Sequence, residues 1–278
     1  MDTQTKKELQ KIALKVRLGI IEGVHAAKSG HPGGSLSCAD ILTYLYFKQM
    51  NIDPKDPKKA DRDRLVLSKG HAAPALYSVL AQRGYFSEDE LLHLRHIGSM
   101  LQGHPDMKHI PGVDMSSGSL GQGISAACGM ALSAKHFGDS FKVYTVLGDG
   151  EIEEGQVWEA AMFAANKGLS NLTAFVDFNN LQIDGTIGEV NSAEPIDKKF
   201  EAFNWHTIVI DGHDFDQIEA ALKEAETVDK PVAIVAKTVK GKGVSYMENA
   251  VNWHGAAPND ELYEVAMNEL RAQLASIQ

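Results

Sequence analysis

The sequence has few cysteines and lacks an apolar run in its first residues, and each of these shortages excludes a class of protein. Its two cysteines, Cys38 and Cys128, lie among small and apolar residues. We therefore expect buried free thiols rather than a disulfide framework or a catalytic thiol. The polar, charged segment 1–11 predicts no secretory signal. A cytoplasmic protein is the expectation that fits both observations.

Positive charge is also in short supply. There are 27 lysines and arginines against 37 aspartates and glutamates, and the net charge is −10. Because nucleic-acid binding depends on clustered positive charge, we expect no nucleic-acid partner. An uncharged stretch of membrane-spanning length, 115–134, contains five serines and four glycines. It is therefore not a lipid-facing helix, and we expect no membrane partner.

What the sequence does contain is an alternation of strand-like and helix-like segments. Runs typical of strands occupy 64–68, 142–147, 172–178, 207–210 and 232–236. Helical patterns occupy 5–28, 36–50, 72–83, 88–97, 118–136, 151–166, 214–228 and 260–276, while 98–118 and 180–195 look irregular. This alternation predicts an α/β fold with a doubly wound, mainly parallel sheet and helices on both faces.

We expect a single domain over 1–278, since no internal repeat or linker interrupts the chain. Sheets of this kind bind ligands beyond the carboxyl ends of their strands. The loops at 68–71, 148–150 and 179–181 each follow a predicted strand. They should therefore lie together at one edge of the sheet.

Two residues whose side-chain oxygens suit a hard cation follow two of these strands. Asp149 lies between Gly148 and Gly150 after the strand at 142–147, and Asn179 follows the strand at 172–178. Mg²⁺ is usually held by one or two carboxylates together with phosphates and water. Asp149 would supply a carboxylate, Asn179 an amide oxygen and Leu181 a backbone carbonyl. A cation held in this way can bind a diphosphate. Helix amides after Gly150 would add only ~0.3–2 kcal/mol, so the cation must neutralise most of the charge.

Three acids, Glu151, Glu153 and Glu154, follow the turn. Beside a bare diphosphate they would repel it, which favours an intervening cation. A Gly-Asp-Gly turn alone is more typical of a tight turn with acids at a helix start and a structural asparagine than of a metal site. The two strand ends, with Asn179 thirty positions after Asp149, favour the metal site.

Five further motifs accompany this pattern: Ser29-Gly30-His31-Pro32-Gly33, Ser68-Lys69-Gly70-His71, Gly103-His104-Pro105, Gly118-Ser119-Leu120-Gly121-Gln122-Gly123 and Val251-Asn252-Trp253-His254-Gly255. In order and spacing they resemble the diphosphate-binding domain of the transketolase family, over roughly residues 6–260. The resemblance implies transfer of a two-carbon glycolaldehyde unit from a ketose phosphate to an aldose phosphate, as in the pentose phosphate pathway. It implies thiamine diphosphate as cofactor, with Mg²⁺ or another divalent cation such as Ca²⁺ or Mn²⁺.

The resemblance also implies roles for individual residues. The metal ligands would be Asp149, Asn179 and Leu181. Cofactor contacts would come from His71, Gly118, Leu120, Gly148, Asp149, Gly150, Glu154, Asn179 and His254. The histidines that face the substrate would be His31, His104 and His254. Glu154 and Glu159 match acids of the family's subunit contact.

The family's pattern extends beyond these 278 residues. Complete transketolases add a pyrimidine-binding domain and a C-terminal domain. Nothing here matches the family's glutamate that protonates the aminopyrimidine, or its phosphate-binding arginines. The resemblance therefore implies the N-terminal subunit of a split transketolase, active only with a C-terminal subunit that supplies the pyrimidine-binding domain. We expect a heterotetramer with two copies of each chain.

Several alternatives stay open at this point. The chain could be a truncation of a longer enzyme. It could be half of another thiamine diphosphate enzyme, such as a deoxyxylulose phosphate synthase or a dehydrogenase component, or of a transketolase that acts on an unusual ketose. The same fold could also serve as a non-catalytic module that binds a metal or a nucleotide.

Overall fold

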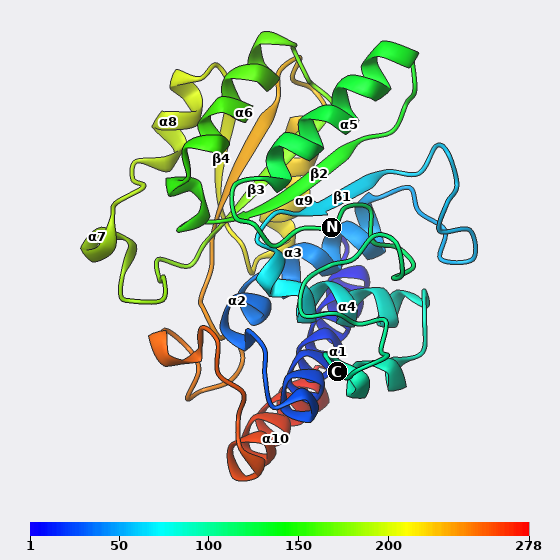
Figure 1. Cartoon of the computed structure of the whole chain (residues 1–278), viewed down its shortest axis with the longest axis vertical. Coiled ribbons are helices and arrows are strands. Elements are labelled where there is room, and N and C mark those ends of the chain that lie inside the picture. The colour runs from blue at the N-terminus through cyan, green and yellow to red at the C-terminus, as the bar shows by residue number, and fades with distance from the viewer. Residues whose placement is uncertain (278) are drawn as a thin grey trace.

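A five-stranded sheet, in which all paired strands are parallel, forms the centre of the molecule (Figure 1). The computed structural model describes residues 1–277. The strands are β1 (Arg64–Leu67), β2 (Val143–Gly148), β3 (Leu172–Phe178), β4 (His206–Asp211) and β5 (Val232–Lys237). Their order across the sheet is β1-β2-β3-β5-β4. The parallel α/β sheet predicted from the sequence is confirmed, and each predicted strand is present.

Each face of the sheet has its own hydrophobic core, because successive side chains of a strand point to opposite faces. In β2, Tyr144 and Val146 belong to one core, and Val143 and Leu147 belong to the other. Helices α1 (Thr3–Ala27), α3 (Ala39–Tyr44), α4 (Ala73–Arg83) and α9 (Phe215–Ala225) contribute to the first core. Helices α5 (Gly123–Phe137), α6 (Gly155–Asn166) and α8 (Ile196–Ala202) contribute to the second (Figure 1).

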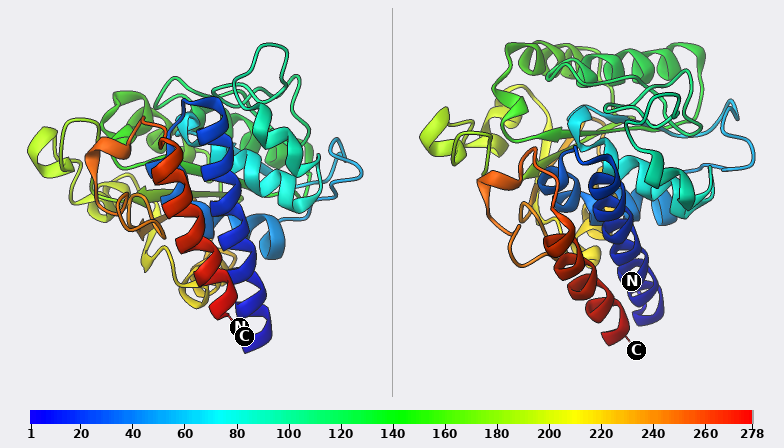
Figure 2. Two further views of the ribbon diagram at one scale, coloured as in Figure 1. Left: turned by 90° about the horizontal axis from the view of Figure 1, so that it is seen from below. Right: turned by 60° about the horizontal axis from the view of Figure 1, so that its bottom comes forward.

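The last helix, α10 (Asp260–Ser276), packs against the first. Figure 2 shows α1 and α10 side by side and antiparallel, so that the two ends of the chain lie close together. Met267 and Leu270 of α10 are buried in the same core as Leu9 and Val16 of α1. The predicted helix at 260–276 is therefore present, and its apolar side covers α1.

Helix boundaries differ most from the prediction where glycines or short turns interrupt the chain. The predicted helix at 36–50 is divided into α2 (Pro32–Ser37), α3 and a π-helical turn at Leu45–Gln49. The predicted helix at 118–136 begins only at Gly123, because Gly118 and Gly121 have positive φ angles that a right-handed helix does not allow. The segment predicted as a helix over 88–97 is a 3₁₀-helix at Glu88–His93.

The stretch at 180–195, predicted to be irregular, contains the short helix α7 (Ile187–Val190). Thr186 and Glu189 form a capping box at its start, in which each side chain accepts a hydrogen bond from the other's backbone amide. The remaining short helices are 3₁₀ turns at Gly70–Ala72, Glu151–Glu153 and Val251–Trp253. Threonine followed three positions later by glutamate was the available sequence signal for α7.

Cys38 and Cys128 are both buried free thiols, as predicted. Among residues 1–277, none of the helices combines the length and the apolar character needed to span a membrane.

Candidate active site

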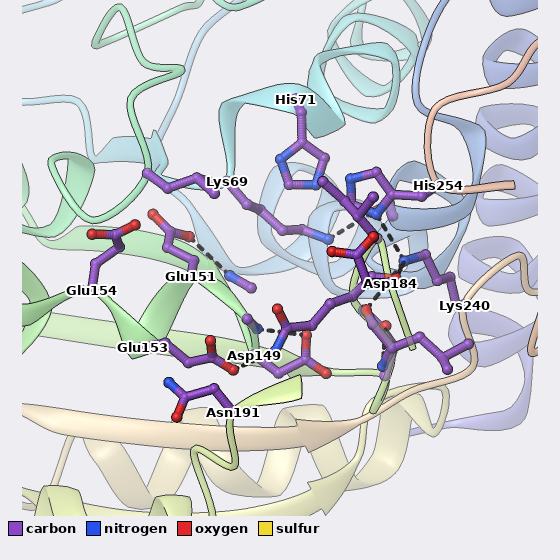
Figure 3. A pocket seen from close by; sticks show the side chains of 18 residues that line it. Lys69, His71, Asp149, Glu151, Glu153, Glu154, Asp184, Asn191, Lys240 and His254 are labelled. Atoms are coloured by element: carbon purple, nitrogen blue, oxygen red, sulfur yellow. Dashed lines mark hydrogen bonds between the residues drawn. The ribbon is translucent and has the colours of Figure 1, made fainter. Parts of the chain in front are cut away.

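A cavity of about 440 Å³ opens at the carboxyl edge of the sheet. Loops that follow β1, β2, β3 and β5 form its walls, together with the segment around residue 254 (Figure 3). Its lining consists of Gly34, Lys69, His71, Leu120, Gly148, Asp149, Gly150, Glu151, Glu153, Glu154, Asn179, Leu181, Gln182, Ile183, Asp184, Asn191, Lys240 and His254. A volume in this range accommodates a typical small-molecule ligand.

Asp149 and Asn179 both line this cavity because they follow β2 and β3, which are parallel neighbours with Gly148 paired to Asp177. One carboxylate oxygen of Asp149, Oδ2, accepts a hydrogen bond of 2.6 Å from the amide of Asn180. Both side chains are buried, with exposed fractions of 3% and 7%. The structure therefore brings together the two side chains predicted to share a cation.

Within residues 1–277 the carboxylate of Asp149 forms no ion pair, although the charge of Lys69 acts on it from a greater distance. Burial raises the pKa of Asp149 to about 7, and the nearby carboxylate of Asp177 adds to the effect. Asp177 itself is paired with the buried ammonium of Lys69, so that charge is already neutralised. A divalent cation beside Asp149 would supply the missing positive charge.

Lys240 is the buried cation of the same cavity. Its side chain is 1% exposed, and its Nζ donates a 3.1 Å hydrogen bond to the carbonyl of Leu181 and lies 2.9 Å from Nδ1 of His254. Within residues 1–277 no carboxylate forms an ion pair with Lys240. Burial lowers the pKa of Lys240 to about 8. Sequence analysis missed Lys69 and Lys240, although both follow strands at the carboxyl edge of the sheet.

The cavity therefore fits a diphosphate with a bound cation. Asp149 and Lys240, a buried anion and a buried cation, line the same space, and within residues 1–277 neither forms an ion pair, although the carboxylate of Asp149 partly offsets the effect of burial on the pKa of Lys240. The carbonyl of Leu181, the third predicted metal ligand, accepts from Lys240 and keeps a second lone pair. A cation would pair with Asp149, and a phosphate oxygen would pair with Lys240.

Three of the predicted histidines gather beside the cavity, and a fourth lies close to them. The ring of His31 is 5.3 Å from that of His71 and 5.6 Å from that of His254, and His104 is 6.5 Å away from His31. Burial lowers the pKa of His31 and of His254 to about 4, and it also lowers the pKa of His71 well below its usual value. These imidazoles are therefore neutral at pH 7 and can both donate and accept hydrogen bonds.

One histidine nitrogen is left without a partner. Nδ1 of His31 is buried, and no described residue forms a hydrogen bond with it. The protein covers this nitrogen, His31 does not line the cavity, and buried polar atoms of Thr43, Thr145 and Asn171 likewise lack a partner within residues 1–277. The unpaired nitrogen therefore gives no evidence of a ligand.

Arg95 joins the two loops that carry His31 and His104. Its Nη1 donates to Oγ of Ser29 at 3.1 Å, and its Nη2 donates to the carbonyl of Gly103 at 3.4 Å. After burial, its positive charge is the next cause of the lowered pKa of both histidines. Sequence analysis did not find Arg95, because it lies outside every motif.

Glu151 differs from the other two acids of its segment. Its carboxylate accepts hydrogen bonds from the amides of Gly121 and Gly148, at 3.0 and 2.9 Å, and from the hydroxyl of Ser68. It therefore connects three loops of the cavity and is satisfied by donors of the protein. Glu153 and Glu154 lie at the rim. Glu159, predicted to belong to a subunit contact, is exposed on α6 and does not line the cavity.

The predicted ring-contacting residues come from one loop. Leu120 lines the cavity with 38% of its surface exposed, which leaves an apolar surface for a ligand. Gly118 has a φ of +149°, and a Cβ at this position would lie 2.9 Å from the ring of His104. Only glycine allows this loop to pass so close to the histidine.

Gly70→Ala should disrupt this arrangement. A Cβ at residue 70 would lie 2.7 Å from the backbone nitrogen of Gly118 and 2.8 Å from the carbonyl carbon of Ser117. Because backbone atoms cannot rotate away, we expect a loss of about 1–3 kcal/mol in the free energy of unfolding. Chemical denaturation measures it. Gly129→Ala, where no atom lies within 4 Å, should instead leave stability unchanged or raise it. Equal effects of the two substitutions would contradict the packing argument.

Comparison with known proteins identifies the family. The family described as "Transketolase, thiamine diphosphate binding domain" matches residues 8–274. The 6-deoxy-6-sulfo-D-fructose transketolase subunit SqwG of Clostridium sp. (strain MSTE9) is 46% identical over 267 residues, covering 96% of this chain and 97% of the relative. One of the apulose-4-phosphate transketolase subunits of Phocaeicola vulgatus is 41% identical over 265 residues, covering 95% and 94% of the two chains.

Solved structures agree with this assignment. The transketolase of Campylobacter jejuni superposes with a TM-score of 0.91 at 34% identity, covering 100% of this chain and 46% of its own. The chain thus spans less than half of that transketolase but nearly the whole length of the two transketolase subunits. It belongs to the transketolase family and corresponds to the thiamine diphosphate-binding subunit of a transketolase that is divided into subunits.

Proposed function

We propose that this subunit holds the diphosphate of thiamine diphosphate through a divalent cation, and that a C-terminal partner subunit completes the site. The observation that carries the proposal is that a buried carboxylate, Asp149, and a buried ammonium, Lys240, line one cavity without forming an ion pair within residues 1–277. Asp149, Asn179 and the carbonyl of Leu181 would bind the cation. Lys240 and His71 would bind phosphate oxygens, with Gly148 and Gly150 allowing the close approach, while the amide of Gly150 donates to Oδ1 of Asp149 at 2.9 Å.

The cofactor, when bound, supplies the carbanion-stabilising chemistry that breaks and forms the carbon–carbon bond of the sugar. The residues of this chain bind, orient and exchange protons. His31, His104 and His254 are neutral, so they can accept a proton from a sugar hydroxyl or return one. Leu120 and Gly118 would cover the cofactor's rings, and Glu151 keeps their loop in place through the amide of Gly121.

The substrates we propose are a ketose phosphate as donor of the glycolaldehyde unit and an aldose phosphate as acceptor, as in the pentose phosphate pathway of the cytoplasm. A second candidate is a less common ketose. It is favoured by the two relatives matched over their whole length, whose names refer to 6-deoxy-6-sulfo-D-fructose and apulose 4-phosphate. Much of the choice between them belongs to the partner, because the cavity of this chain presents one wall of the site.

Dependence on the partner is the direct test of this proposal. We expect the purified chain to bind thiamine diphosphate with Mg²⁺ weakly and to cleave no ketose. Addition of a C-terminal subunit with a pyrimidine-binding domain should produce tight cofactor binding, cleavage of xylulose 5-phosphate or another ketose, and a mass corresponding to two copies of each chain. Calorimetry, a coupled assay and light scattering measure the three quantities. Full activity of the isolated chain would contradict the proposal.

His104→Ala should lower turnover of the assembled enzyme more than cofactor binding. His104 lies beside His31, away from the residues proposed to hold the diphosphate. General acid–base groups contribute about 10²–10⁴-fold, so we expect kcat to fall by at least about 100-fold. The dissociation constant of thiamine diphosphate should stay within about threefold, a change below ~1 kcal/mol. His254→Ala should impair both, since His254 contacts Lys240.

The exposed His93 provides a matched control, because it lies outside the cavity. His93→Ala should change neither quantity. Parallel losses of turnover and cofactor affinity in His104→Ala would place that histidine at the cofactor rather than at the substrate.

A further inference from the structure

Hydrogen bonds from residues that do not line the cavity fix the backbone of the loop that carries Lys240. Val239, the preceding residue, donates its backbone amide to Nε2 of His213 at 2.9 Å. Lys242, two positions after Lys240, accepts a 3.1 Å hydrogen bond from Nε of Arg17 through its carbonyl. The backbone is therefore fixed on both sides of the buried ammonium.

A carboxylate connects these two contacts. Asp40 forms an ion pair with Arg17, at 2.6 Å, and its Oδ2 lies 2.7 Å from Nδ1 of His213. The side chains of Arg17, Asp40 and His213 are 5%, 8% and 14% exposed. They line a second cavity of about 310 Å³ with residues of α1, α9 and α10, and none of them lines the first cavity.

The hydrogen bonds define the tautomer of His213. A backbone amide only donates, so Nε2 must be the unprotonated acceptor, and Nδ1 must carry the proton that Asp40 accepts. Asp40 therefore orients the ring in the way that a carboxylate orients a metal-binding histidine. The result is a histidine whose acceptor nitrogen is directed at one backbone amide of the Lys240 loop.

We propose that His213 is a positioning residue of the cofactor site, which places the ammonium of Lys240 by accepting the amide hydrogen of Val239. The inference rests on the proposed role of Lys240 in binding the diphosphate. Loss of this acceptor leaves the Val239 amide unpaired and frees the loop to move. Since the displaced group is a charged donor to the cofactor, the loss should be larger in cofactor affinity than in turnover at saturating cofactor, which Lys240 reaches only through its contact with His254.

Two substitutions of His213 separate the acceptor from the rest of the ring. The amide of Gln extends about as far as Nε2, so His213→Gln can still accept from Val239. The shorter side chain of His213→Asn can donate to Asp40 from its amide nitrogen, as Nδ1 does, but it does not reach the backbone amide of Val239. In the assembled enzyme, His213→Asn should weaken binding of thiamine diphosphate with Mg²⁺ by about 10–100-fold, as loss of an orienting partner does. His213→Gln should stay within about threefold of the unmodified enzyme, less than ~1 kcal/mol.

A double-mutant cycle with Lys240→Met tests whether His213 acts through Lys240. If it does, His213→Asn adds no further loss of cofactor affinity when Lys240 is already replaced. Unchanged cofactor affinity in His213→Asn, or equal losses in the Asn and Gln variants, would overturn the inference. So would a full additional loss in the double mutant. Failure of the unmodified complex to bind the cofactor would instead refute the proposed function, so the two failures are distinguishable.

Discussion

Asp149→Asn is expected to abolish the cation-dependent binding of thiamine diphosphate by the assembled enzyme and to lower ketose cleavage by more than about 100-fold. Partners that merely orient metal ligands already cost about 10–100-fold when they are replaced, so loss of a ligand's charge should cost more. Asparagine retains the size of the side chain and removes the negative charge that balances the cation. Calorimetric titration with Mg²⁺ and thiamine diphosphate, followed by an activity assay, measures both effects.

The same substitution should not destabilise the chain in the absence of cofactor. Because burial raises the pKa of Asp149, folding disfavours its charged form, and at pH 8 the carboxylate costs folding free energy. We therefore expect the melting temperature at pH 8 to be unchanged or higher. Asp229→Asn, the same chemical change at an exposed position before β5, is the matched control for binding. Retained Mg²⁺-dependent binding in Asp149→Asn would show that the cation is held elsewhere.

Lys240→Met is expected to have the second-largest effect. Removal of one member of a buried, hydrogen-bonded charge pair costs about 2–5 kcal/mol, so the dissociation constant for thiamine diphosphate should rise by about 30-fold or more. Methionine occupies a similar volume and makes no ionic contact. Titration calorimetry of the assembled enzyme at a fixed Mg²⁺ concentration measures the change.

Lys240→Met should raise the stability of the cofactor-free chain even though it weakens cofactor binding. Burial lowers the pKa of Lys240 to about 8, so folding disfavours the ammonium, and below pH 8 its charge reduces the stability of the cofactor-free chain. The melting temperature of Lys240→Met at pH 7 should therefore be higher than that of the unmodified chain. Lys230→Met, which replaces an exposed lysine, controls for the change in net charge. A lower melting temperature together with unchanged affinity would show that Lys240 is a structural residue.

Sequence patterns predicted the sheet and the centre of the cavity because both follow from local rules. Runs of β-branched and aromatic residues define the strands, and parallel strands place their carboxyl ends at one edge. Asp149 and Asn179 therefore had to be neighbours once β2 and β3 were recognised. Lys69 and His71 follow β1 for the same reason, although only His71 was selected.

The site residues that the sequence did not predict depend on side-chain directions that no local sequence pattern encodes. Arg95 has a φ of +62° and contacts two loops, and Lys240 reaches the cavity from the loop that follows β5. Glu151 follows the Gly-Asp-Gly turn, yet its carboxylate is directed at the amides of Gly121 and Gly148. In each case the packing of distant loops determines the role of the side chain.

The parallel pairing of β1 with β2 has a consequence for how the molecule assembles. Arg64 is paired with Val143, so the edge strand must find a partner far along the chain before the loop bearing Lys69 and His71 is in place. Contacts between residues so distant in sequence form slowly, because a long loop must close first. We infer that β1 pairs with β2 late in folding. A nascent chain that has been synthesised only as far as residue 142 would lack the strand with which β1 pairs.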